Sequence, residues 1–339
     1  VPVGVRLGAP PPAPTPGPVR ARRHDRSAPD RTRPRPAARG PALTAPATAT
    51  GAAAARAAAA LALNACLWGV SWWPFRVLQQ QGVHGLWATA LVYLLVAGAI
   101  VARAPGAPSR VARTRSLWPL LVASGVANAG FNWAVTIGDV VRVVLLFYLM
   151  PAWAALLARA VLGERLRPAV LLRVALALAG AAVVLKPPDA PWPLPRDAAD
   201  LLAIAGGIGF AATNVMLRRE AAQPESARAF AMFCGGWLVA GTTGAALTLA
   251  GAIGAPPAPA PGWLAGIGLL ALMFGVGNLA LQYGAARLPA NVTSVVLLSE
   301  VLFASASAVA WGGETVSAAT FVGGALIVAA ALLAVRDPR

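Results

Sequence analysis

The stretch GVANAGFNWAV, residues 125–135, recurs 150 positions further along the chain as GVGNLALQYGA, residues 275–285. Both segments are uncharged, and the most informative match is the polar position that they share, Asn128 in the first and Asn278 in the second. The same shift also aligns Gly125 with Gly275, Val126 with Val276, Gly163 with Gly313 and Glu164 with Glu314. Matches that keep one register over this distance indicate two copies of one structural unit.

The composition places both copies in a membrane. Hydrophobic residues make up 58% of the chain and charged residues 12%, with a mean hydropathy of +0.66, whereas soluble domains average roughly 25% charged residues. A helix needs ~20 residues to cross a hydrocarbon core. Apolar runs of that length predict ten helices, at 57–77, 85–102, 117–137, 140–161, 168–186, 200–217, 229–250, 263–285, 290–311 and 316–335.

The ten helices and the repeat together predict the fold class, an all-α integral membrane protein. Each copy contains five helices, and an odd number makes the second copy enter the membrane from the opposite side. The two copies are therefore expected to be inverted repeats, at residues 57–186 and 200–335. Inverted repeats are typical of alternating-access transporters, whose substrate site lies between the repeats near the membrane midplane.

The net charge of +16 does not indicate a nucleic-acid partner, because ten of the 28 basic residues lie in residues 1–56. This segment is rich in Pro and Ala and cannot bury enough apolar surface to fold, so we expect a disordered tail. The tail either belongs to the mature protein or results from a misplaced start codon, and the sequence leaves both readings open.

Basic residues also predict the orientation. With the N-terminus inside, the cytoplasmic loops hold Arg103, Arg110, Arg113, Arg115, Arg159, Arg165, Arg167, Arg218, Arg219, Arg228 and Arg287. The external loops hold little beyond Arg76, Lys186 and Arg196. An excess of Lys and Arg marks cytoplasmic loops, so we expect a multi-pass protein of the cytoplasmic membrane with both termini in the cytoplasm.

Three segments resemble the EamA family of the drug/metabolite transporter superfamily. They are LWG at 67–69, FYLMPAWAALLARAVLGERLRPAVL at 147–171 and its echo LLSEVLFASASAVAWGGETVSAATF at 297–321. The resemblance covers residues 57–335 and implies ten helices in two repeats and the transport of amino acids, other metabolites or drugs. The chain departs from the family pattern at Arg173, where Gly is usual, and at Val301, where Pro is common.

Glu300 is the one acidic residue in an apolar run, and no basic residue lies within twelve positions of it. Thr293, Glu300 and Ser307 are spaced by seven residues, so on a continuous helix they share one face. An ionised Glu at the bilayer centre costs ~3 kcal/mol, which favours a helix that lines a wet cavity. Alternatively, Glu300 is protonated, or pairs with a buried Arg, in a contact between helices.

Arg142 and Arg76 are the candidate counter-charges for Glu300. Arg142 follows Asp139 by three residues. It is therefore expected either to pair with Asp139 within one helix or to receive a substrate carboxylate in bidentate geometry. Arg76 is expected to extend its side chain to the membrane interface.

Other polar and aromatic residues are weaker candidates for the pathway. Asn128, Asn278 and Tyr148 either offer hydrogen bonds inside a cavity or join helices to one another. Trp68 and Trp72, one helical turn apart, either form a wall of the site or pack between the repeats.

Three residues are expected to act on the helices themselves. Glu164 and Glu314 each follow a Gly at a helix end, which indicates a structural role in ending one helix and capping the next. Pro151 removes a backbone hydrogen bond in mid-helix and is expected to form a kink that serves as a hinge.

These features predict a secondary transporter that exports a small organic metabolite such as an amino acid. No GxxxxGK[ST] loop is present, so the energy source is proton exchange at Glu300, unless flow is passive. The expected partners are the substrate, the lipid bilayer and protons. We expect no cofactor, no metal site and no enzymatic activity, since two His and two Cys fit none of the known intramembrane protease patterns. The alternatives are an intramembrane enzyme of unrecognised type and a non-transporting membrane scaffold.

Overall fold

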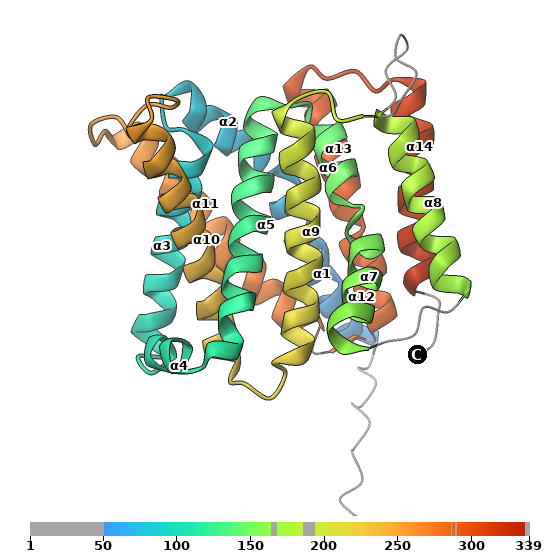
Figure 1. Ribbon diagram of the computed structural model, residues 1–339, viewed down its shortest axis with the longest axis horizontal. Helices are drawn as coiled ribbons and strands as arrows, with labels where there is room; N and C mark the ends of the chain where they lie inside the picture. Colours follow the sequence, from blue (N-terminus) through green and yellow to red (C-terminus); the bar gives the residue numbers. More distant parts are fainter. Residues whose placement is uncertain (1–50, 164–167, 186–193, 286, 289, 336–339) are drawn as a thin grey trace, which may run out of the picture. The chain divides into compact units, whose positions relative to one another are not determined.

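Helices form every regular element in the computed structural model, which describes residues 51–163, 168–185, 194–285, 287–288 and 290–335 (Figure 1). These residues belong to one compact unit, 46–339. The expected tail lies outside the described residues as far as position 50, and so does Glu164. Residues 51–56, expected in the tail, are helical instead. Their run of Ala explains the difference, since Ala has the highest helix propensity.

The helices of the first copy are α1 (Gly51–Val70), α2 (Trp72–Gln80), α3 (Gly85–Arg103), α4 (Ala107–Arg113), the 3₁₀ helix η1 (Arg115–Leu117), α5 (Trp118–Ile137), α6 (Val140–Phe147), α7 (Met150–Leu162) and α8 (Pro168–Leu185). Those of the second are α9 (Ala198–Arg219), α10 (Glu225–Leu249), α11 (Pro261–Ala285), α12 (Ala290–Leu297), α13 (Ser299–Gly312) and α14 (Ala318–Val335).

Seven helical segments of the described residues are long and apolar enough to cross a membrane. They are 52–80, 85–103, 115–137, 140–161, 198–219, 225–249 and 261–285. Two shorter apolar helices cover 168–184 and 318–330. The helical class is confirmed, whereas the number of ten spans stays a prediction.

The fold repeats in the register that the sequence predicts. Helix α6 at 140–147 returns as α12 at 290–297, and α8 at 168–185 returns as α14 at 318–335, in each case after 150 residues. Both copies also end a helix in the same way, at Gly163 with φ 71° and at Gly313 with φ 66°. Gly adopts this left-handed conformation without a steric penalty, which explains its use as a helix terminator.

Helices α8 and α14 pack against each other in opposite directions. A Cβ atom on Gly180 would lie 2.8 Å from Ile327, and one on Gly323 would lie 2.6 Å from Val184, so later residues of α8 face earlier residues of α14. Equivalent helices that run antiparallel are what an inverted repeat requires, and this pair supports the predicted inversion.

Both copies contain a broken helix. Helix α6 ends at Phe147 and α7 begins at Met150, so the break precedes Pro151, which lies within the first turn of α7. Here the sequence correctly predicts an interruption. The equivalent break between α12 and α13 falls at Leu298 without a Pro. There the Ser299 hydroxyl donates to the Val296 carbonyl (2.6 Å). A side-chain hydrogen bond of this kind competes with the backbone hydrogen bonds of a helix and bends it.

Helix α6 occupies the core. All eight of its residues are buried, and it contacts α5, α8, α9, α13 and α14. Helices α5 and α9, one from each copy, pack along their length beside it (Figure 1). The centre of the unit is therefore built from both copies.

We expect Gly180→Leu to destabilise the protein, because a Cβ at this position would lie 2.6 Å from the Gly323 carbonyl oxygen. Overpacking of this kind costs about 1–3 kcal/mol. The thermal unfolding midpoint in detergent micelles should fall for this variant and stay unchanged for Ala179→Leu, on the exposed side of α8. Equal midpoints for the two variants would show that the helices do not pack at Gly180.

Candidate functional site

A cavity of about 270 Å³ lies between helices of the two copies. The described lining residues with aromatic side chains are Trp68, Tyr93, Phe131, Phe147, Tyr148, Phe210 and Phe233. Those with polar side chains are Asn64, Ser124, Asn128, Thr213, Asn214, Asn278 and Glu300. Among the described residues that line the cavity, none is Lys, Arg or His. The lining is therefore mainly apolar and rich in aromatic rings, and Glu300 is the charged residue among the described lining residues.

Glu300 and Tyr148 meet at the two helix breaks. Tyr148 lies between α6 and α7, Glu300 lies in the first turn of α13, and the Tyr148 hydroxyl donates to Glu300 Oε2 (3.2 Å). Neither of the arginines predicted as counter-charges contacts Glu300 in the described residues. The start of a helix carries partial positive charge, which favours a carboxylate in its first turn. The sequence suggested Arg142 and Arg76 as partners of Glu300, whereas the structure places Tyr148 beside it.

We call the aromatic lining residues the aromatic wall, and ring contacts hold this wall in place. The wall consists of Trp68, Tyr93, Phe131, Phe147, Tyr148, Phe210 and Phe233. Trp68 stacks on Phe274 with centroids 4.3 Å apart, while Phe147 packs against Phe131 at 4.7 Å and against Phe210 at 5.4 Å. Aromatic pairs at such distances contribute about 0.5–1.5 kcal/mol each beyond the burial of their area. The wall is therefore preorganised without a ligand.

The side-chain amides of the lining differ in which of their oxygen and nitrogen atoms have a hydrogen-bond partner. Asn128 is engaged on both sides, since its Oδ1 accepts from the Tyr93 hydroxyl and its Nδ2 donates to the Ser124 carbonyl (2.8 Å). Asn278 Oδ1 accepts from Gln282 Nε2 (2.5 Å). Asn64 is buried, and its Oδ1 has no hydrogen-bond partner among the described residues. The sequence analysis missed Asn64, although a polar residue in the apolar run of the first helix was a usable signal.

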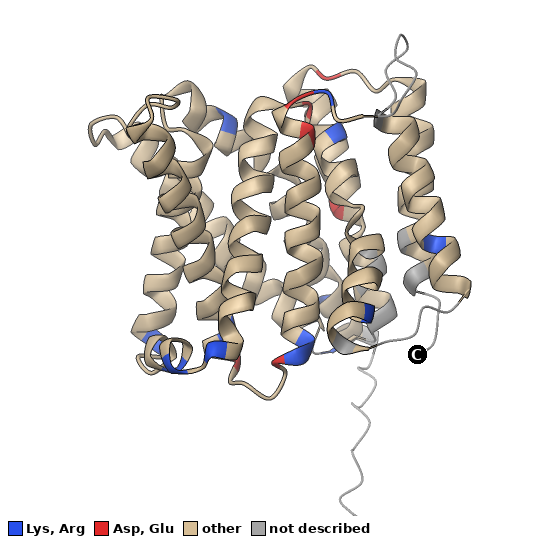
Figure 2. Ribbon diagram, viewed as in Figure 1, with Lys and Arg blue, Asp and Glu red and all other residues tan. Residues whose placement is uncertain are grey.

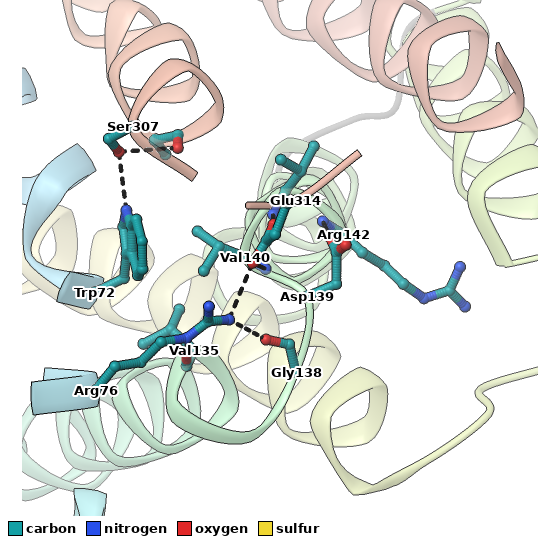
Figure 3. Close-up of polar contacts among 11 residues, drawn as sticks. Trp72, Arg76, Val135, Gly138, Asp139, Val140, Arg142, Ser307 and Glu314 are labelled. Atoms are coloured by element: carbon teal, nitrogen blue, oxygen red, sulfur yellow. Dashed lines mark hydrogen bonds and ion pairs between the residues drawn. The ribbon is translucent and has the colours of Figure 1, made fainter. Parts of the chain in front are cut away.

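Trp72, Thr293 and Ser307 were predicted to face the pathway, but none of them is among the described residues of the cavity lining. The Trp72 indole donates to the Ser307 hydroxyl (2.9 Å) between α2 and α13, where both side chains are buried (Figure 3). Thr293 is buried on α12. The prediction assumed one continuous helix, and the break at Leu298 removes the common face. For Trp72, packing between the repeats is the reading that the structure favours.

Arg76 joins the two copies instead of extending to the membrane interface. Its Nη2 donates to Glu314 Oε1 (3.0 Å) and to the Gly138 carbonyl (2.5 Å), and its Nε donates to the Val135 carbonyl (3.0 Å) (Figure 3). We call the contact between Arg76 and Glu314 the clasp. It ties α2 and the end of α5 to the segment that follows α13.

Glu314 follows the end of α13, as predicted, but caps a different helix from the one expected. Its carboxylate accepts from the backbone N–H groups of Val140 (2.9 Å) and Val141 (3.2 Å) at the start of α6. The next helix, α14, is capped by Ser317, whose hydroxyl accepts from the Thr320 N–H (3.1 Å). The Glu314 carboxylate therefore accepts hydrogen bonds from two places in the first copy, the Arg76 side chain and the backbone at the start of α6.

Arg142 pairs with an acid that its local sequence does not reveal. Its Nε and Nη2 donate to the two oxygens of Asp200 (2.7 and 2.8 Å), and its Nη1 donates to the Val184 carbonyl. Asp139 instead accepts from the Arg142 backbone N–H (2.7 Å), as the cap of α6. Figure 3 shows the guanidinium pointing away from Glu314. All three guanidinium nitrogens, Nε, Nη1 and Nη2, donate hydrogen bonds within the protein, so the structure does not present Arg142 to a substrate.

The cavity reaches toward one end of the helices. Its lining includes Leu217, two residues before the end of α9 at Arg219, and Leu281, four residues before the end of α11. This end, which we call the arginine-rich end, carries Arg103, Arg110, Arg113, Arg115, Arg218 and Arg219 (Figure 2). The clasp lies at the opposite ends of α5 and α13.

Comparison with known proteins gives one family match. The EamA-like transporter family matches residues 56–186 and again residues 197–336. One solved structure, described as "Crystal structure of protein", shares 24% sequence identity over 84% of this chain and 97% of that chain, with a TM-score of 0.49. A search of curated proteins finds no match.

We expect Arg142→Gln to lower the stability of the protein, because it leaves Asp200 as a buried charge without its bidentate partner. Breaking one side of a buried ion pair costs about 3–5 kcal/mol. The double variant Arg142→Gln/Asp200→Asn removes both charges and should recover part of the loss in the thermal unfolding midpoint. A stable Arg142→Gln protein with impaired ligand binding would instead support the substrate role.

Proposed function

The chain belongs to the EamA-like transporter family, and on that premise we propose that it moves a small organic metabolite, such as an amino acid, by alternating access. Membership makes it a multi-pass membrane protein and a transporter of the drug/metabolite type. The finer proposal concerns the site, the coupling and the direction of transport.

The observation that carries the proposal is the position of the cavity at two helix breaks. Tyr148 and Leu298 interrupt equivalent helices of the two copies, and the cavity contacts both breaks through Tyr148, Leu297 and Glu300. Broken helices between inverted repeats are where secondary transporters bind their substrates. A single carboxylate within an aromatic cavity fits a binding site better than it fits a packed core.

Proton coupling is proposed to act at Glu300. Tyr148 is the titratable side chain that contacts Glu300 among the described residues, and no ion pair there fixes the charge of the carboxylate. A carboxylate that binds either a proton or the substrate exchanges one for the other across the membrane. The sequence contains no nucleotide-binding loop that would supply another energy source.

The two ends of the bundle suggest which state the structure represents. The cavity extends toward the arginine-rich end, while the clasp and the Trp72–Ser307 hydrogen bond join the copies at the other end. Lys and Arg mark cytoplasmic loops, so we propose a cytoplasm-facing cavity with the clasp as the closed external gate. Export follows if substrate enters from the cytoplasm and leaves when the clasp opens, with the breaks near Pro151 and Leu298 as hinges.

We expect Glu300→Gln to abolish the dependence of transport on a pH gradient. In proteoliposomes, uptake of radiolabelled substrate by the wild type should follow the gradient, because protonation of Glu300 is coupled to substrate release. The variant cannot change charge, so its flux should be the same with and without the gradient. Glu225→Gln, at an exposed position of α10, is the control and should behave like the wild type.

Gradient-dependent flux in Glu300→Gln would exclude Glu300 as the proton site. Flux in the wild type that ignores the gradient would indicate a facilitator.

The clasp makes a second prediction. In a Cys66→Ala/Cys234→Ala background, a reporter Ala308→Cys lies at a fully buried position of α13. Arg76→Gln should raise the rate at which a water-soluble thiol reagent labels it by about tenfold, since a charge-assisted hydrogen bond contributes ~1.5–3 kcal/mol. Arg196→Gln, which removes only a 3.9 Å ion pair with Asp200, should leave the rate unchanged.

Equal labelling rates with and without Arg76 would show that the clasp does not control access at this end.

A further inference from the structure

We infer that the substrate is an organic cation, an ammonium group on an apolar or aromatic skeleton without a free carboxylate. The inference rests on the proposed function, because it assigns a ligand class to the same cavity. It keeps the small organic metabolite of that proposal and replaces the amino acid, given there as an example, with an amine that has no carboxylate.

Charge is the first argument. Glu300 is the charged side chain among the described lining residues, and no Lys, Arg or His balances it there. The two arginines that the sequence suggested as counter-charges are already paired, Arg142 with Asp200 and Arg76 with Glu314. A substrate carboxylate would meet a like charge with no cation to receive it, which disfavours anions and zwitterions. A ligand cation would instead neutralise Glu300.

The hydroxyl groups of the lining supply the second argument. The four hydroxyl groups of the described lining all donate to acceptors within the protein. Tyr93 donates to Asn128, Tyr148 to Glu300, Ser124 to the Met232 carbonyl (3.1 Å) and Thr213 to the Gly209 carbonyl (2.9 Å). Glu300 and the unpartnered Oδ1 of Asn64, by contrast, are acceptors. An ammonium group, which carries donors only, supplies what these acceptors lack.

The aromatic wall supplies the third argument for a cationic ligand. Trp68, Tyr93 and Phe233 line the cavity together with Glu300, and aromatic rings attract cations that lie within about 6 Å of the ring centroid. The same rings offer an apolar surface to the rest of the skeleton. With a volume of about 270 Å³, the cavity is close to the lower limit for ligand pockets, so it fits a single-ring compound.

The test compares three ligands that share one phenylalkyl skeleton: 2-phenylethylamine, 3-phenylpropanoate and phenylalanine. Their binding is measured by isothermal titration calorimetry on the full chain in lipid nanodiscs, and their flux in proteoliposomes. We expect the amine to bind at least about tenfold more tightly than phenylalanine, and phenylpropanoate not to bind. Tetraethylammonium is a second cation that has no phenyl ring, so its binding reports on the positive charge alone.

Variants locate the binding. Glu300→Gln should weaken binding of the amine by about tenfold or more, whereas Glu300→Asp keeps the carboxylate and should retain measurable binding. The second variant guards against a loss of binding caused by misfolding alone. Tighter binding of phenylalanine or phenylpropanoate than of the amine would overturn the inference, and so would failure of both cations to bind at millimolar concentration.

Flux separates this inference from the proposed function. Phenylalanine moving in place of the amine would leave the transporter proposal intact and overturn the substrate class. Binding of the amine at Glu300 without flux of any ligand would support the ligand class and contradict transport.

Discussion

The hydrocarbon core of a bilayer offers no hydrogen-bond partner to a polar group, and this constraint explains the partners of the charged residues buried among the described helices. Arg142 is buried in the core but has all of its donor types engaged by Asp200 and by the Val184 carbonyl. Glu314 is engaged by Arg76 and by the start of α6. Glu300 differs from these two charged groups, since it has one hydroxyl partner and a cavity beside it. A membrane protein tolerates such a group where water or a ligand reaches it.

Periodicity and local signals made much of the fold predictable. The 150-residue repeat predicts that α6 and α8 return as α12 and α14, and the matched glycines Gly163 and Gly313 follow the ends of α7 and α13. Pro151 indicates one helix break, but nothing in the local pattern reveals the break at Leu298, where Ser299 bonds back to the backbone. That missed break moved Thr293 and Ser307 off the face on which spacing alone had placed them.

Partners far apart in the sequence were not predictable from single residues. Asp200 lies 58 residues from Arg142, and Glu314 lies 238 residues from Arg76. Local reasoning therefore offered Asp139 or a substrate carboxylate as the partner of the first, and the membrane interface as the place of the second. The helices α6 and α8 recur as α12 and α14, but the chemistry does not repeat with them, because Met150 occupies the position equivalent to Glu300. Among its described lining residues, the cavity between the two copies therefore carries a charged residue, Glu300, on the side of the second copy only.

The central claim is that Glu300 holds the positive end of a ligand inside a cavity closed by the clasp. Its most direct test is an experimental structure of the protein in lipid nanodiscs with 2-phenylethylamine bound. The account predicts the ligand nitrogen within hydrogen-bond distance of the Glu300 carboxylate, its ring against the aromatic wall, and the Arg76–Glu314 contact intact. A ligand found elsewhere in the protein, or one whose amine faces away from Glu300, would contradict it.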